Sequence, residues 1–191
     1  MVQKAKGNQP DINKGFVDYR TAEGAILVDV RTPKEYREGH IPGSKNVPLQ
    51  QLDKISSVTD NKNVPMFVYC YSGGRSRQAT YMLQDWNRCV DAINAVSTYS
   101  DRPEPVLRCI FDQLLAFDDR HKAVIRDEAA GAAFAASFGR YHELLRSQLA
   151  SPLRKFCDSD FAARFIAEAL LTWTVEGTDF EEIQGMIGKL F

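Results

Sequence analysis

The first hundred residues alternate short apolar runs with polar and turn-forming segments. The apolar runs lie at residues 25–30 (AILVDV), 40–49 (HIPGSKNVPL) and 64–70 (VPMFVYC). Runs of this length that are rich in β-branched or aromatic residues are typical of strands buried on both faces, as in a parallel sheet. The pattern therefore predicts short buried strands in this half of the chain.

Helix signals lie between these runs. Residues 32–35 (TPKE) form a capping box with proline at the first helical position, which predicts a helix start. Residues 75–85 predict another helix, with Ala79, Met82 and Leu83 on its buried side. Strands that alternate with helices indicate an α/β fold, in which helices flank a parallel sheet and the crossovers are right-handed.

After Tyr99 the strand signals almost disappear. The polar segment 100–105 (SDRPEP) predicts a junction between a first domain, residues 1–102, and a second domain, residues 103–191. Apolar residues recur at helical spacing within residues 106–117, 132–149 and 160–176, so we expect the second domain to be all-α.

Helix ends are also predicted in the second domain. Ser151-Pro152 has the form of an N-cap followed by proline, and Gly177 is placed to end a helix. Residues 178–181 (TDFE) form a second capping box, which predicts a last helix from Thr178 through Leu190.

The composition is that of a globular protein, with 44% apolar and 26% charged residues in a chain of 191. No apolar run approaches the roughly 20 residues that cross a membrane. The first residues are polar and carry no secretory signal, so we expect a cytoplasmic protein with no membrane partner. Residues 1–102 carry 14 Lys and Arg against 11 Asp and Glu, and residues 103–191 carry 10 against 14. Because neither half has a basic patch, no direct binding of nucleic acid is expected.

Cysteine and histidine spacing gives no metal signal. The four cysteines include no CxxC pair, so neither a zinc site nor a disulfide framework is expected, and each is first a candidate buried apolar residue. His121 and His142 lie 21 residues apart, too far for a tight ligand motif, and are expected on solvated helix faces.

Cys70 has a context that argues for chemistry. It follows an apolar strand and precedes two glycines, an arginine and a serine, in the stretch CYSGGRS. The carboxyl edge of a parallel sheet is where α/β proteins usually bind ligands, and the following helix N-terminus attracts anions. Gly73 and Gly74 allow the backbone to curl into a nest of N–H groups, which lowers the pKa of a cysteine. A buried structural cysteine before an ordinary glycine turn is the alternative.

Residues of about 10–102 resemble a single-domain rhodanese, a sulfurtransferase. Besides CYSGGRS, the resemblance rests on the segment ILVDVRTPKEYREGHIPGSKNVPL, whose matching positions are Asp29, Arg31, Glu35, Tyr36, His40, Ile41, Pro42 and Gly43. The resemblance implies a parallel sheet of about five strands, with Cys70 as the persulfide-carrying nucleophile. It implies no metal or organic cofactor. The substrate-binding residues that it implies are Tyr71, Ser72, Gly73, Gly74, Arg75 and Ser76.

Other positions also bear on the resemblance to rhodaneses. Asn94-Ala95 stands where rhodaneses often carry a Gly-Gly pair after the last strand, which is expected to reshape the site slightly. His40 is expected to be structural, and Asp29 and Arg31 to form an ion pair. The six residues from Cys70 to Arg75 match the sulfurtransferase loop, whereas related phosphatases use a loop one residue longer.

Residues of about 104–191 resemble the C-terminal ligand-binding and dimerisation region of tetracycline-repressor (TetR) type regulators. The resemblance rests on residues 160–191, including Trp173 and Gly177. It implies a homodimer formed through the C-terminal helices, or a site for a small effector.

The expected function is transfer of sulfane sulfur from thiosulfate, or a related small anionic donor, to cyanide or a thiol through a Cys70 persulfide. A sulfur-sensing regulatory protein whose helical half dimerises or binds an effector is the alternative. Phosphatase or arsenate reductase activity is a weaker one.

Overall fold

The computed structural model describes residues 12–188 except 60, 62 and 126–145. The chain folds into two compact units, Met1–Leu83 and Gln84–Phe191. The boundary along the chain between these units falls inside the helix Gly74–Tyr99, whereas the sequence predicts a junction at 102/103. A domain boundary at 102/103 stays a prediction.

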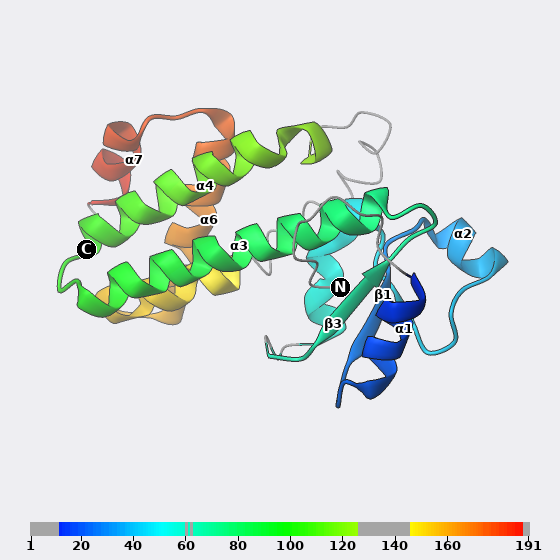
Figure 1. The fold of residues 1–191 in the computed structure, drawn as a ribbon. Helices are drawn as coiled ribbons and strands as arrows, with labels where there is room; N and C mark the ends of the chain where they lie inside the picture. Colours follow the sequence, from blue (N-terminus) through cyan, green and yellow to red (C-terminus); the bar gives the residue numbers. More distant parts are fainter. Residues whose placement is uncertain (1–11, 60, 62, 126–145, 189–191) are drawn as a thin grey trace. The chain divides into compact units, whose positions relative to one another are not determined.

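A parallel sheet organises the first unit. Its strands are β1 (Ile26–Asp29), β2 (Lys45–Asn46) and β3 (Met66–Tyr69), in the order β2-β1-β3. Strands β1 and β3 lie side by side in Figure 1. Val28 pairs in parallel register with Lys45 on one side and with Val68 on the other. The three predicted runs therefore form strands. The family's expected count of about five is wrong for the described residues, which form three strands.

Helices surround this sheet. They are α1 (Ile12–Thr21), α2 (Pro33–Glu38), the 3₁₀ segment η1 (Leu49–Ser57) and the start of α3 (Gly74–Tyr99). The capping box of α2 is confirmed, because Oγ1 of Thr32 accepts from the amide of Glu35 and the Glu35 carboxylate accepts from the amide of Thr32. Helix α1 lies against β3, where the rings of Tyr19 and Phe67 meet edge to face at 5.8 Å.

Helix α3 is much longer than the predicted 75–85. Buried positions continue along it at helical spacing beyond the predicted end: Trp86, Cys89, Val90 and Ile93. This apolar stripe keeps residues 86–99 helical, so no strand follows α3 in the described chain. Asn94-Ala95 consequently lies within α3, in the second unit. The expectation that this pair follows a last strand and reshapes the Cys70 loop is wrong.

The second unit is helical, as predicted. After α3 come α4 (Pro103–Ile125), a helical stretch at 146–153, η2 (Arg154–Phe156), α6 (Asp160–Glu176) and α7 (Phe180–Ile187). Helix α6 packs against both α4 and α7. The predicted helix 132–149 falls mostly outside the described residues. Fully buried aliphatic side chains form the core of this unit, among them Ile110, Leu149, Leu153, Ile166, Leu170 and Ile183.

Two helix ends differ from the predictions and one agrees. Gly177 ends α6 with φ 84°, as predicted, because this left-handed conformation suits glycine. The N-cap of α7 is Asp179, one residue after the predicted Thr178, and its carboxylate accepts from the amide of Glu182. Ser151-Pro152 lies inside the helix 146–153 and does not start one. The hydroxyl of Ser97 donates to the carbonyl of Pro152 at 2.9 Å, which holds this helix against α3.

A buried charged cluster joins α3 to α4 in the second unit. Asp85 accepts from Nε of Arg120 and lies 2.8 Å from Nε2 of His121, whose side chain is only 2% exposed. The expectation that His121 lies on a solvated helix face is therefore wrong. The reason is long-range, since its partner Asp85 precedes it by 36 residues. His142 lies outside the described residues.

None of the helices in the described part of the chain is long and apolar enough to cross a membrane.

Candidate active site

Cys70 directly follows β3, so its thiol lies at the carboxyl edge of the parallel sheet, as predicted. The chain then turns through Gly73, whose φ of 86° lies in the left-handed region that favours glycine. Helix α3 begins at Gly74. This sharp turn brings the first residues of the helix back toward the thiol.

Two backbone amides and one hydroxyl surround the sulfur of Cys70. The amide of Gly73 donates to Sγ at 3.2 Å and the amide of Ser76 at 3.4 Å. The thiol of Cys70 donates to Oγ of Ser76 at 3.6 Å, and Oγ of Ser76 donates its own proton to the carbonyl of Gly73. A hydroxyl can rotate, so the Ser76 proton is within reach of Sγ once the thiol is deprotonated. The loop therefore forms the predicted nest around the sulfur.

This nest favours the thiolate. Burial by itself raises the pKa of the Cys70 thiol, but the hydrogen bonds from the amide and hydroxyl of Ser76 and from the amides of Gly73 and Ser72 lower it below its ordinary value. Burial raises the pKa of the other three thiols, those of Cys89, Cys109 and Cys157. A thiolate is the reactive form of cysteine, so Cys70 is the most nucleophilic of the four.

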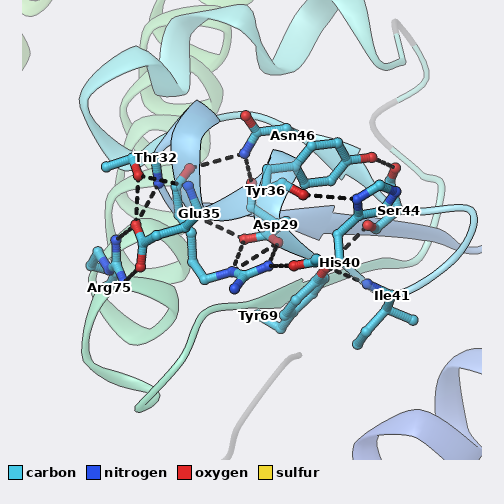
Figure 2. Close-up of polar contacts among 12 residues, drawn as sticks. Asp29, Thr32, Glu35, Tyr36, His40, Ile41, Ser44, Asn46, Tyr69 and Arg75 are labelled. Carbon is cyan, nitrogen blue, oxygen red and sulfur yellow. Dashed lines mark hydrogen bonds and ion pairs between the residues drawn. The ribbon is translucent and has the colours of Figure 1, made fainter.

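Arg75 is held by a carboxylate. Its two terminal nitrogens donate to the two oxygens of Glu35, each at 2.7 Å (Figure 2). The same carboxylate caps α2 through Thr32, so one side chain joins the start of α2 to the active loop. The Arg75 hydrogen bonds, and then those from Thr32, hold the pKa of Glu35 well below its usual range. Glu35 is a site residue that the sequence analysis assigned only to capping.

A second arginine of the first unit, Arg31, is also paired with a carboxylate. Asp29 is fully buried and accepts three hydrogen bonds from the Arg31 side chain, which confirms the predicted ion pair. Nη2 of Arg31 also donates to the carbonyl of Gly39. Beside this pair, the hydroxyl of Tyr69 accepts from the amide of Ile41 and bonds Oγ of Ser44 (Figure 2). These contacts fix the HIPGS turn against the end of β3.

A cavity of about 950 Å³ opens at the sulfur. Five of the predicted site residues line it, namely Cys70, Tyr71, Ser72, Gly73 and Ser76. Gly74 and Arg75 are not among the lining residues. Helix α1 also contributes to the lining, through Asn13, Gly15 and Phe16. The sequence analysis assigned no role to this helix.

Strand β3, Cys70, the glycine turn and the start of α3 all lie within a region that matches a known family. Residues 13–100 match the Rhodanese-like domain. This match confirms the predicted rhodanese-like α/β fold of the first half, and it ends at residue 100, near the end of α3.

Curated relatives agree over parts of the chain. The uncharacterized protein YqhL of Bacillus subtilis is 38% identical over 77 residues, which cover 40% of this chain and 56% of that protein. The thiosulfate sulfurtransferase PspE of Escherichia coli is 36% identical over 59 residues, covering 30% and 57% respectively. The HTH-type transcriptional regulator Rv0324 of Mycobacterium tuberculosis is 40% identical over 52 residues, covering 27% and 22%. The chain thus spans little more than half of the first two relatives. No solved structure matches it.

His40 of the rhodanese-like domain lines the cavity and stacks on Tyr36, with ring centroids 3.8 Å apart. Its Nδ1 lies 2.9 Å from the carbonyl of Tyr36. Both contacts suit the predicted structural role. Within the described ranges, no group of three or more His, Cys, Asp or Glu side chains is arranged to hold a metal ion.

The Ser76 hydroxyl is expected to set part of the thiol acidity. In Ser76→Ala the backbone amide stays but the hydroxyl is lost, so the pKa of Cys70 should rise. Because the thiolate forms as pH rises through this pKa, the rate of alkylation at pH 7 should fall about 3–10-fold. The pH profile of iodoacetamide labelling at Cys70, followed by peptide mass spectrometry, measures both quantities.

Ser72→Ala is the matched control for this measurement, since it removes a hydroxyl from the same loop while keeping the amide that faces Sγ. Its midpoint should stay within about 0.2 units of the wild type. Equal midpoints for Ser76→Ala and the wild type would contradict a role for the Ser76 hydroxyl.

Proposed function

We propose that the rhodanese-like domain moves sulfane sulfur from thiosulfate, or a related donor, to cyanide or a thiol through a persulfide on Cys70. The observation that carries the proposal is the convergence of the Gly73 and Ser76 amides on Sγ at the floor of an open cavity. The thiosulfate sulfurtransferase PspE is a relative of the matched region, which supports this class of reaction.

In the first half-reaction the Cys70 thiolate attacks the outer sulfur of thiosulfate. A new S–S bond forms at Sγ while the S–S bond of the donor breaks, and its electron pair leaves with sulfite. In the second half-reaction cyanide or a thiolate attacks the terminal sulfur of the persulfide. The persulfide bond then breaks and Cys70 returns as a thiolate.

The loop amides stabilise negative charge through both steps. The terminal sulfur of a persulfide is anionic, and amides at the start of a helix hold an anion without a protein cation. Neither half-reaction needs a proton from the protein, so the proposed reaction requires no general base beside Cys70. Ser76 adds a hydroxyl within reach of the sulfur.

The direct test is the intact mass of the protein after incubation with thiosulfate. We expect a gain of one sulfur atom, which peptide mapping places on Cys70 and which cyanide or a thiol removes. A folded protein that gains no sulfur would contradict the proposal. Sulfur found on Cys89, Cys109 or Cys157 instead would contradict the assignment of the nucleophile.

A sensing role is the second candidate, favoured by the helical unit. Helix α6 exposes two large apolar side chains, Phe161 and Phe165, which suits a helix that pairs with a second copy of the chain. The relative Rv0324 is a transcriptional regulator. A homodimer through the C-terminal helices of this TetR-like half would transmit the state of Cys70. A stable persulfide with slow turnover, together with a change of oligomeric state in light scattering, would favour this role over catalysis.

A further inference from the structure

Two arginines near the active loop are each paired with a carboxylate. Arg75 belongs to the loop itself, and its two terminal nitrogens donate to the two oxygens of Glu35, each at 2.7 Å. Arg31 lines the cavity at Cys70, and its Nη2 lies 2.7 Å from Oδ2 of the buried Asp29. Each of these positive charges is therefore matched by a negative charge in direct contact.

Arg75 lies near the sulfur without lining the cavity. It follows Gly74 at the start of α3, yet it is not among the described residues that line the cavity. The pKa of its guanidinium is raised chiefly by the hydrogen bond with Glu35, against the effect of burial, and further by the charge of Cys70. The guanidinium is thus within electrostatic range of the thiolate, while its hydrogen bonds go to Glu35.

The carboxylate of Glu35 is itself fixed from the other side. Its Oε2 accepts from Oγ1 of Thr32 at 2.7 Å and from the amide of Thr32 at 2.9 Å (Figure 2). The hydrogen bonds from Arg75 and from Thr32 hold the pKa of Glu35 well below its usual range, so the carboxylate is ionised at neutral pH. A pair with two parallel hydrogen bonds that also caps a helix is more specific than an ordinary surface ion pair.

A free arginine in this loop would change which ligands the loop binds. A guanidinium binds phosphate and other tetrahedral oxyanions through paired hydrogen bonds. The amides of Gly73 and Ser76 that face Sγ already form a nest that attracts negative charge. An uncompensated guanidinium beside this nest would let an unreactive oxyanion occupy the loop and cover Cys70. With the guanidinium neutralised, the amides hold the reacting sulfur and attract such anions only weakly.

We propose that Glu35 is a specificity-determining residue of the active loop, which neutralises Arg75 and so prevents phosphate and similar oxyanions from blocking Cys70. Specificity is a difference between affinities, and this residue acts by lowering the affinity for the unwanted ligand. Glu35 is not among the residues that line the cavity, so it acts through Arg75. The proposal rests on the proposed sulfurtransferase function, because it concerns the selectivity of the same loop.

The test measures how inorganic phosphate protects Cys70 from iodoacetamide at constant ionic strength, followed by peptide mass spectrometry. Phosphate in the loop covers Sγ, so the concentration that halves the labelling rate reports its Kd. In Glu35→Gln this concentration should fall about tenfold, because the freed guanidinium adds a charge-assisted hydrogen bond to phosphate. The pKa of Cys70 should also fall, since a free positive charge favours the thiolate. A merely structural role of Glu35 would not increase the affinity for an anion.

Glu38→Gln is the matched control. It removes the same charge from the same helix, α2, but Glu38 is 65% exposed and lies 4.0 Å from Nζ of Lys34. Its half-protecting phosphate concentration should stay within about twofold of the wild type. Phosphate binding as tight as in Glu35→Gln would show that net charge sets the affinity, and would overturn the specific role of Glu35.

The double variant Glu35→Gln/Arg75→Gln tests whether the effect runs through Arg75. It removes both charges of the pair, so it should bind phosphate as weakly as the wild type. Tight binding that persists in the double variant would overturn the role of Arg75. Much weaker binding than in the wild type would show that Arg75 already holds anions there, and would also overturn the proposal. This comparison does not use Glu35→Gln, so a folding defect in the single variant does not remove the test.

Labelling of Cys70 does not depend on sulfur transfer, so the two proposals fail separately. Equal phosphate protection in the wild type and Glu35→Gln would overturn the role of Glu35 while sulfuration of Cys70 stands. A Cys70 that gains no sulfur from thiosulfate would overturn the proposed function whatever the phosphate result.

Discussion

Replacement of Cys70 with alanine is expected to lower sulfur transfer at least about 10³-fold, to the rate of the reaction without protein. The reason is that the described residues around the cavity include no other thiol. Burial raises the pKa of the remaining three cysteines, so they stay protonated at neutral pH. Thiocyanate formation from a saturating donor and cyanide measures the loss.

Cys109→Ala serves as the control for this variant. Cys109 is half-buried in α4 and lies in the other compact unit, so its removal should leave turnover within about twofold of the wild type. A Cys70→Ala protein that retains a tenth of the wild-type rate would show that the sulfur is carried elsewhere. Circular dichroism of both variants establishes that they are folded.

Asp29→Asn is expected to cost the first unit about 2–4 kcal/mol of stability. The carboxylate of Asp29 is fully buried and accepts from the backbone amide, Nε and Nη2 of Arg31. Asparagine keeps the shape but removes the charge and places an amide N–H₂ against a guanidinium that is only 14% exposed. An unpaired charge in such a position is strongly unfavourable, whereas the loss of an exposed pair is not.

Hydrogen exchange measures this loss within the correct unit. Both tryptophans, Trp86 and Trp173, lie in the second unit, so fluorescence does not report on the sheet. Peptides that cover β1 and β3 should lose protection by about 30–1,000-fold in Asp29→Asn. Glu38→Gln is the matched control, because Glu38 is an exposed carboxylate 4.0 Å from exposed Lys34 and its loss should cost less than about 0.5 kcal/mol. Equal protection in the two variants would contradict a structural role for the Asp29–Arg31 pair.

Features that depend on a few neighbouring residues were predictable. The capping box at Thr32 and the left-handed glycine at Gly177 form as expected, since each hydrogen bond joins residues within one helical turn. The buried runs that became β1 and β3 also carry their own signal in period and composition. The nest at Cys70 belongs to this class, because all its donors lie within six residues of the sulfur.

Features that depend on a distant partner were missed or misplaced. Glu35 was assigned only to capping, because Arg75, its partner in the loop, follows it by 40 residues. His121 has an ordinary surface sequence context and is buried only because Asp85 and Phe117 lie beside it. The strand expected from the family near Asn94 was overridden by an apolar stripe that packs within the second unit.

The sequence by itself determined the α/β and all-α halves, the runs that form the strands β1, β2 and β3, and the loop from Cys70 to Ser76. Their physical basis is local: periodicity, capping and glycine conformation act over a few residues. Only the tertiary structure decided that Glu35 holds Arg75 and that α1 places Phe16 in the lining of the cavity at Cys70. Those contacts join segments far apart in the chain, where hydrophobic burial and charge pairing select partners that no local pattern encodes.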